Sequence, residues 1–145
     1  MVADAQSGTG TLKLRVLSPL GSVVDAEVRS VMLPGLEGDF TVLTEHHETV
    51  AQLRPGVGMY TSAGEEHLMS LFGGVATVHN DEITVVSPVC EAAEAIDVAR
   101  AQEARERAKE RLARKDDETI DVERAQAALQ RALLRLHATE LSGRK

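Results

Sequence analysis

Aromatic residues and cysteine are scarce in this sequence. Among its 145 residues there are no Trp, one Tyr and two Phe, so a hydrophobic core must consist of Val, Leu, Ile, Met and Ala. The single cysteine, Cys90, excludes an internal disulfide framework and is typical of a reducing compartment. No stretch approaches the roughly 20 apolar residues of a membrane-spanning helix. Residues 1–10 lack both a basic and an apolar run, so we expect no signal peptide there.

Charge is unevenly distributed along the chain. Residues 1–90 carry 11 acidic and 4 basic side chains, whereas residues 91–145 carry 12 of each, and the formal net charge is −7. This change in composition favours a boundary between two domains near residue 90. An acidic chain with so few aromatic residues is poorly suited to nucleic-acid binding, so we expect no nucleic-acid partner.

The first ninety residues have the pattern of short β-strands. Leu12, Leu14 and Val16 alternate with Lys13 and Arg15, which is the two-residue period of a strand with one buried face. Turn residues recur about every ten positions, and they predict a hairpin at 62–65 and a bulge or close backbone approach at Gly73-Gly74. Further strands are expected at 23–24, 28–33, 40–43, 50–53, 58–61, 67–72, 75–78 and 83–86. This pattern is typical of an antiparallel sandwich or barrel.

The last third has the pattern of two amphipathic helices, over residues 94–114 and 120–141. Apolar residues in each are spaced three and four apart, without Gly or Pro, and so share one face. The short acidic segment 115–118 favours an antiparallel hairpin whose apolar stripes face each other. The expected stripes are Val98, Ala101, Ala104, Ala108 and Leu112, and Val122, Ala125, Leu129, Leu133 and Leu136.

The predicted fold class is therefore α+β. An N-terminal antiparallel β-sandwich, residues 1–90, is followed by a C-terminal antiparallel two-helix hairpin, residues 91–145. We find no long internal repeat in the chain.

Docking of the two helices on each other should be weak. The first stripe is mostly Ala, whereas burying a Leu gains roughly 1.5–3 kcal/mol. The helices themselves should be supported by surface pairs such as Glu103 with Arg107 and Glu110 with Arg114, worth about 0.2–0.5 kcal/mol each. Robust helices with weak docking suit an element that opens and closes. A rigid terminal hairpin is the alternative that the pattern also allows.

Candidate catalytic and metal-binding groups are few. The densest group of potential ligands is Glu45-His46-His47-Glu48. A solvated loop is favoured there over a metal site, because adjacent strand side chains point to opposite faces and no further ligand has a recognisable spacing. Cys90 lacks the flanking signature of a nucleophile and is interpreted as a packed thiol. Phosphate-loop, nucleophile-elbow and His-Glu-x-x-His motifs are absent, so we expect a chain that is not itself an enzyme.

The arginines of the two predicted helices are more informative. Arg100 and Arg107 share a face of the first helix, and Arg124, Arg131 and Arg135 share a face of the second. Guanidinium groups arranged in this way can bind phosphates or acidic partner surfaces. A solvated charged face is the alternative, because acidic residues are equally numerous in this part of the chain.

Several segments, taken in order, match a known pattern: 33–35 with 37–40, 53–56, 72–78, 92–101 and 124–132. Together they resemble the epsilon subunit of F-type (proton-translocating) ATP synthases of bacteria and chloroplasts, over about residues 12–141. One segment departs from that family. Its usual Pro-Gly-His-Ala-Pro-like turn is replaced by residues 44–48, in which only His46 matches.

The resemblance implies a non-catalytic central-stalk rotor subunit that couples proton flow to ATP synthesis and requires no cofactor. It implies that the sandwich binds the gamma subunit and the rotor ring of c subunits. It also implies that the hairpin restrains ATP hydrolysis by moving from a compact state to an extended state that meets the alpha/beta catalytic subunits. The implied location is peripheral, on the cytoplasmic face of a bacterial plasma membrane or the stromal face of the thylakoid membrane.

The resemblance also makes ATP a candidate regulatory ligand. In some members, ATP bound to the compact hairpin holds it down through an Ile/Leu-Asp-x-x-Arg-Ala motif, present here at residues 96–101. This implies an alternative function as an ATP-sensing module, although the motif also occurs in members that bind ATP weakly or not detectably. The implied nucleotide-binding residues are Glu91, Ile96, Asp97, Arg100, Ala101, Arg107, Arg131 and Arg135.

Overall fold

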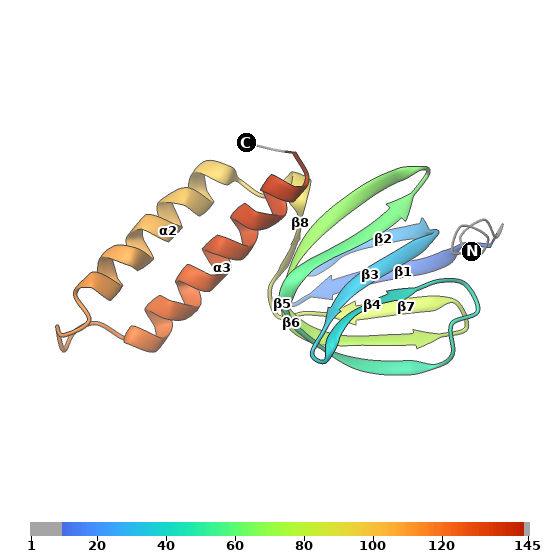
Figure 1. Cartoon of the computed structure of the whole chain (residues 1–145), viewed down its shortest axis with the longest axis horizontal. Helices are drawn as coiled ribbons and strands as arrows, with labels where there is room; N and C mark the ends of the chain where they lie inside the picture. The colour runs from blue at the N-terminus through green and yellow to red at the C-terminus, as the bar shows by residue number, and fades with distance from the viewer. Residues whose placement is uncertain (1–9, 144–145) are drawn as a thin grey trace. The chain divides into compact units, whose positions relative to one another are not determined.

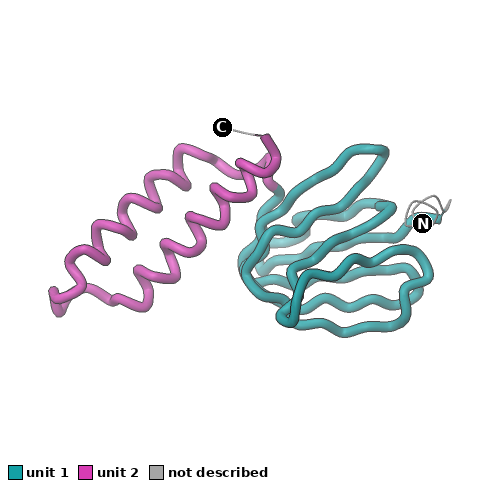
Figure 2. Tube along the Cα trace, in the orientation of Figure 1, with its two compact units in different colours: residues 1–92 teal, residues 93–145 magenta. Residues whose placement is uncertain are grey.

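The computed structural model describes residues 10–143 of the chain. They divide after Ala92 into two compact units, which Figure 2 shows in different colours. The prediction about a signal peptide in residues 1–10 concerns residues that, apart from Gly10, lie outside the described range. None of the helices within residues 10–143 is both long and apolar enough to cross a bilayer.

The first unit is a β-structure in which eight strands are described (Figure 1). Their order is β2-β1-β7-β6-β5-β3-β4, and β8 pairs with β6. All pairs are antiparallel except β1 with β7, which is parallel. The predicted N-terminal β-sandwich is confirmed, with this one parallel pair as an exception. The strands are β1 (Leu12–Ser18), β2 (Gly21–Val28), β3 (Ser30–Gly35), β4 (Gly38–Val42), β5 (Thr49–Ser62), β6 (Glu65–His79), β7 (Glu82–Val86) and β8 (Cys90–Ala92).

The core of this unit is made of aliphatic side chains that alternate along the strands. Leu12, Leu14 and Val16 of β1 are buried, whereas Lys13 and Arg15 between them are exposed, as the two-residue period predicts. The other large buried side chains include Val28, Val31, Leu33, Val42, Met69, Leu71, Ile83 and Val85.

Strand β5 is longer than the sequence indicates. The strands predicted at 50–53 and 58–61 are one strand, which runs through Pro55 and Gly56. Pro55 lacks an amide hydrogen and would normally interrupt a sheet. However, the pairing of β3 with β5 shifts between Met32 and Gly35, and Pro55 has no partner in β3. Proline is therefore tolerated because this stretch of β5 carries no regular ladder on that side.

Strand β6 also joins two predicted strands, across Gly73 and Gly74. Its register with β5 runs without a shift past both glycines. They have φ values of 86° and 120°, and a Cβ atom on Gly74 would lie 2.2 Å from the carbonyl oxygen of Val86. The predicted close backbone approach is thus confirmed at Gly74, where only glycine fits.

The predicted hairpin at residues 62–65 is confirmed. Ser62 pairs with Glu65, and the two residues between them, Ala63 and Gly64, have φ values of 52° and 81°. Positive φ at both central positions is the geometry that matches the twist of the flanking strands.

The boundary between the units differs from the one predicted at residue 90. The short strand β8 pairs with β6, with Cys90 opposite Leu71 and Ala92 opposite Met69, so the sheet extends to residue 92. Three residues are too few to show a two-residue period, so the sequence pattern does not predict this strand.

The second unit is a hairpin of two helices, α2 (Val98–Ala113) and α3 (Val122–Leu141), after a short 3-10 turn, η1 (Ala93–Ala95) (Figure 1). The predicted C-terminal helical hairpin is confirmed. The first helix begins four residues later than predicted, because Asp97 caps it by accepting a hydrogen bond from the amide of Arg100 at 3.0 Å. Asp121 caps α3 in the same way, through the amide of Arg124 at 3.1 Å.

Alanine dominates the buried face between α2 and α3, called the seam below. Ala101 and Ala108 of α2 and Ala125 and Ala132 of α3 are all buried. The predicted place of Leu133 in the seam is wrong, because it is 45% exposed and its neighbour Ala132 is buried instead. Small side chains allow two helix backbones to approach closely, so at this turn of α3 the alanine, and not the larger leucine, lies in the seam.

The predicted surface ion pairs of α2 are not formed within residues 10–143. Neither Glu103 with Arg107 nor Glu110 with Arg114 comes within ion-pair distance. Instead, the Nε of Arg105 donates to Glu106 Oε1 at 3.2 Å. The helix is therefore supported mainly by its cap and its packed face.

Candidate functional site

The motif at residues 96–101 builds the start of α2. Ile96 and Ala101 are 1% and 3% exposed, so their side chains pack inside the protein. The carboxylate of Asp97 is occupied by the amide of Arg100, which satisfies one of the free N–H groups of the helix end. Arg100 itself is exposed. Of the motif side chains, its guanidinium is the one most available to a ligand.

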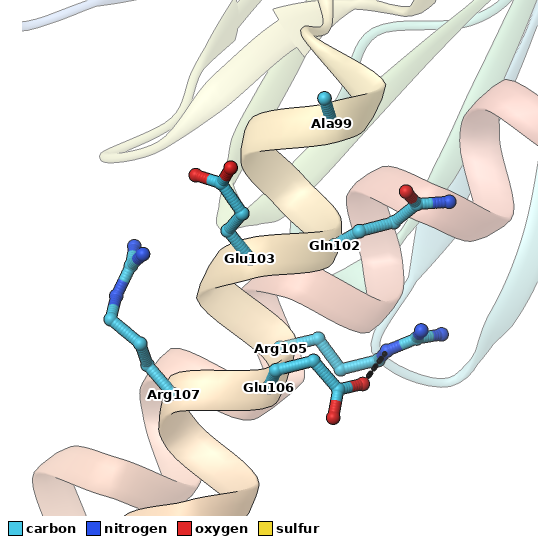
Figure 3. Close-up of a pocket in the computed structure, with 6 residues that line it drawn as sticks. All are labelled: Ala99, Gln102, Glu103, Arg105, Glu106 and Arg107. Carbon is cyan, nitrogen blue, oxygen red and sulfur yellow. Dashed lines mark hydrogen bonds and ion pairs between the residues drawn. The ribbon is translucent and has the colours of Figure 1, made fainter.

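The outer surface of α2 presents both signs of charge. Ala99, Gln102, Glu103, Arg105, Glu106 and Arg107 line an open depression of about 640 Å³. Figure 3 shows Glu103 and Arg107 extending to one side of the helix, and Gln102, Arg105 and Glu106 to the other. Among the described residues, Arg107 forms no ion pair, so its guanidinium can bind an anion by donating hydrogen bonds to it.

Two of the predicted nucleotide-binding arginines, Arg131 and Arg135, belong to α3, which packs on α2. Arg131 and Arg135 are partly buried, and each takes part in an interaction within the chain. Arg100, Arg107, Arg131 and Arg135 are thus distributed over two helices that pack on each other. Their joint role in nucleotide binding stays a prediction.

Glu91, the remaining predicted site residue, belongs to the first unit. It lies in β8 and pairs with Ser70 of β6. The other seven predicted residues belong to the second unit. The part of Glu91 in a nucleotide site also stays a prediction.

The histidine-rich segment at residues 45–48 forms a loop held to the β6–β7 turn. The amide of Glu45 donates to Asp81 Oδ1 at 2.8 Å, and His79 pairs with Glu48 at 2.6 Å. The rings of His46 and His47 stack with centroids 4.6 Å apart. Within residues 10–143, no three His, Cys, Asp or Glu side chains are placed to hold a metal ion.

This loop contains a feature that sequence reasoning missed. Glu45 has a φ of 64°, a left-handed conformation that is uncommon outside glycine, asparagine and aspartate. The glycine of the family's turn would have been the signal for it, since residue 45 is where that turn carries its Gly. Here the hydrogen bond from the Glu45 amide to Asp81 holds a non-glycine residue in this conformation.

Cys90 is a packed thiol, as interpreted from the sequence. Its side chain is buried, and burial, with the negative charge of Glu91 adding to it, raises the pKa of the thiol above its ordinary value. A protonated, buried thiol is a poor nucleophile. Cys90 therefore contributes to packing beside the end of the sheet.

The whole described fold corresponds to a known pair of domains. Residues 11–94 match the family "ATP synthase, Delta/Epsilon chain, beta-sandwich domain". Residues 94–140 match "ATP synthase, Delta/Epsilon chain, long alpha-helix domain". The meeting point of the two matches lies at the same part of the chain as the boundary between the two compact units.

Curated relatives agree with this assignment. The ATP synthase epsilon chain of Bacillus subtilis (strain 168) is 40% identical over 109 residues, which cover 75% of this chain and 83% of the relative. The ATP synthase epsilon chain of Desulfosudis oleivorans is 43% identical over 102 residues, covering 70% and 77%.

Solved structures share the fold. A chain of the Euglena gracilis mitochondrial ATP synthase, in its OSCP/F1/c-ring structure, has a TM-score of 0.67 at 23% identity and covers 85% of this chain and 80% of its own. A chain of the Tetrahymena thermophila mitochondrial ATP synthase central stalk and c-ring has a TM-score of 0.51 at 10% identity, covering 59% and 69%. At these identities the likeness concerns the fold alone.

Proposed function

The chain belongs to the epsilon-chain family of F-type ATP synthases, and from this premise we propose that it is a non-catalytic rotor subunit whose helical hairpin restrains ATP hydrolysis. In this proposal the sheet unit binds the gamma subunit and the rotor ring of c subunits. In its extended state the hairpin reaches the alpha/beta catalytic subunits. The subunit is then peripheral, at the cytoplasmic face of a bacterial plasma membrane or the stromal face of the thylakoid membrane.

The alanine seam is the observation that carries the proposed restraint. Four alanines, Ala101 and Ala108 on α2 and Ala125 and Ala132 on α3, supply its most buried contacts. Each methyl group gains only about 0.8 kcal/mol on burial. Each helix, in contrast, has its own aspartate cap, worth about 1 kcal/mol. The helices can therefore separate without unfolding.

A small energy gap makes such a hairpin controllable. A ligand or partner shifts a two-state equilibrium only by its differential affinity for the two states. Moving the population from 1:99 to 99:1 takes roughly 5.5 kcal/mol. Because the seam buries methyl groups, the free-energy difference between the compact and extended states stays within that amount. A seam of leucines would make this difference larger.

Removal of the hairpin tests this function. Strand β8 ends at Ala92, so a chain that stops before residue 94 retains the whole sheet. We expect the truncated chain to assemble with the gamma subunit and to raise the ATP hydrolysis rate of the complex. Loss of gamma binding would contradict the division of roles between the units. An unchanged hydrolysis rate, with assembly intact, would contradict the restraint.

A second candidate function is ATP sensing by the closed hairpin. It is favoured by the exposure of Arg100 and Arg107 on one face of α2, and by the position of Arg131 and Arg135 on the packed neighbour α3. Arginines from two helices can contact one triphosphate together only while the hairpin is closed, which provides the differential affinity.

Calorimetry on the full chain decides the second candidate. We expect ATP to release heat on binding, and Arg100→Ala and Arg131→Ala each to weaken it. Arg114→Ala is the control, because Arg114 is an exposed cation at the C-cap of α2, the opposite end of that helix from Arg100, and lies outside the predicted set. The absence of heat at millimolar ATP would reject this candidate and leave the rotor proposal standing.

A further inference from the structure

The two helices are copies of one sequence. Residues 96–111 and residues 120–135 are identical at ten of sixteen positions, in the pattern Ile-Asp-Val-x-Arg-Ala-Gln-x-Ala-x-x-Arg-Ala-x-x-Arg. This overturns the expectation that the chain has no long internal repeat. The sequence reading missed it because the shared positions are mostly alanine and arginine, which are common in any charged helix.

Equivalent positions of the repeat have equivalent structures. Asp97 and Asp121 cap their helices with hydrogen bonds of 3.0 and 3.1 Å, and their ψ angles are 105° and 101°. In the repeat, Ala101 occupies the position equivalent to Ala125, and Ala108 the position equivalent to Ala132. These four residues are the buried alanines of the seam. An antiparallel pair of like helices that pack through like faces has approximate two-fold symmetry. Its two ends therefore resemble each other.

The end of the hairpin at the turn contains a cavity of about 300 Å³. Its lining residues are Arg111, Thr119, Ile120, Asp121, Arg124 and Ala125. All but Thr119 have repeat equivalents, and these are, in the same order, Arg135, Ile96, Asp97, Arg100 and Ala101. The cavity is thus the symmetric counterpart of the end where the predicted nucleotide residues of the second unit gather, but none of its own residues belongs to that set.

The charges of this cavity favour an anion. Arg111 comes from α2 and Arg124 from α3, both side chains are exposed, and within residues 10–143 neither guanidinium forms an ion pair. The carboxylate of Asp121 accepts the amide of Arg124. The carboxylate of Asp117 in the turn accepts the amide and the hydroxyl of Thr119 at 2.9 and 2.7 Å. Both acids are therefore engaged by local donors, and both guanidinium groups remain available.

We propose that this cavity is a binding site for a phosphate-bearing anion, held between Arg111 and Arg124. A guanidinium group presents a planar fork of donors that suits phosphate oxygens. A volume near 300 Å³ lies at the small end of ligand pockets, which fits phosphate, pyrophosphate or the phosphate tail of a nucleotide. Since one arginine comes from each helix, the bound anion stabilises the closed hairpin at its turn.

Backbone NMR on the full chain tests the site with three probes: inorganic phosphate, pyrophosphate and ATP. We expect the amides of Thr119 and Arg124 to shift saturably with pyrophosphate. Arg111→Ala or Arg124→Ala should raise the dissociation constant about tenfold or more, as expected for loss of a charged hydrogen-bonding group. A response to the inorganic anions identifies a free anion as the ligand, and a response to ATP alone identifies a nucleotide; either supports the site.

Arg114→Ala is the matched control, because Arg114 is an exposed arginine next to the turn that does not line the cavity. The proposal is overturned if no probe gives a saturable shift, or if Arg114→Ala weakens binding as much as Arg124→Ala. The result is separate from that of the proposed ATP site. Amides of residues 97–101 report that site in the same spectra, so either site can fail while the other stands.

Discussion

The two units bury different kinds of side chain. In the sheet unit, Leu14, Leu33, Leu71 and Ile83 are completely buried, and each contributes roughly 1.5–3 kcal/mol. In the helical unit most buried side chains are alanines, with Ile96 and Leu136 as the large exceptions. The sheet is therefore stabilised by its core, and the hairpin by its separate helices. This difference suits one unit to keep its shape and the other to change it.

Capping and turn geometry extend this contrast. The sheet fixes its connections with left-handed residues, as at Ala63 and Asn80, which hold strands in one register. The helices fix only their own ends, through Asp97 and Asp121. The two aspartate caps thus stabilise each helix separately and do not hold the two helices together.

The largest expected effect lies in the sheet core. Leu14→Ala should cost about 2–5 kcal/mol in the free energy of unfolding, because it leaves a cavity among fully buried neighbours. Urea denaturation measures this. Leu20→Ala is the control, since Leu20 is 100% exposed, and it should change stability by less than about 0.5 kcal/mol. Equal costs for the two variants would mean that the sheet unit does not depend on its core, and its contrast with the hairpin would be lost.

A smaller effect is expected in the seam. Ala108→Leu should cost about 1–3 kcal/mol by overpacking a fully buried position. Hydrogen exchange followed by mass spectrometry should show faster exchange in α2 and α3 and no change in the sheet. Ala113→Leu, at an exposed position of the same helix, should leave both unchanged. Faster exchange in both units would mean that they unfold as one.

The helix caps should matter less again. Asp97→Ala and Asp121→Ala should each lower hairpin stability by about 1 kcal/mol, whereas Asp→Ser at either site should retain most of it, because serine also caps. Thermal unfolding by circular dichroism measures the change. The repeat predicts equal effects at the two caps. A large effect at Asp97 with none at Asp121 would show that Asp97 has a role beyond capping.

Much of this comparison could be predicted from the sequence. The alternation of Leu12, Leu14 and Val16 locates a buried strand face directly, and the spacing of apolar residues locates both helices. Pro55 misled the prediction because its effect depends on whether a neighbouring strand needs its amide. Strand β8 was missed because three residues have no measurable period.

The site was less predictable than the fold. Leu133 was assigned to the seam because periodicity marks a face but not which of two adjacent residues lies closest to the partner helix. The turn-end cavity could not be predicted, because it depends on Arg111 and Arg124 meeting across a hairpin whose connection, residues 114–121, is longer than expected. The repeat that links these residues was nonetheless visible in the sequence.

The smallest expected effect lies at the turn of the hairpin, at Asp117. Hydrogen bonds from the amide and hydroxyl of Thr119 lower the pKa of this carboxyl below its ordinary value. A lowered folded-state pKa means that the charged form stabilises the folded turn above the unfolded pKa of about 4, and that this stability is lost as pH falls through the folded pKa.

Asp117→Asn should therefore change how the melting of the hairpin depends on pH and leave the sheet unaffected. At neutral pH the variant should melt slightly below the wild type, by a small margin because the carboxyl is fully exposed. As the pH falls below about 4, the wild type should lose this advantage and the two melting curves of the hairpin should converge. Sheet exchange rates should not separate the two proteins at any pH. A difference that persists unchanged into acid would mean that the neutral hydrogen bond from Thr119, rather than the charge of Asp117, stabilises the turn.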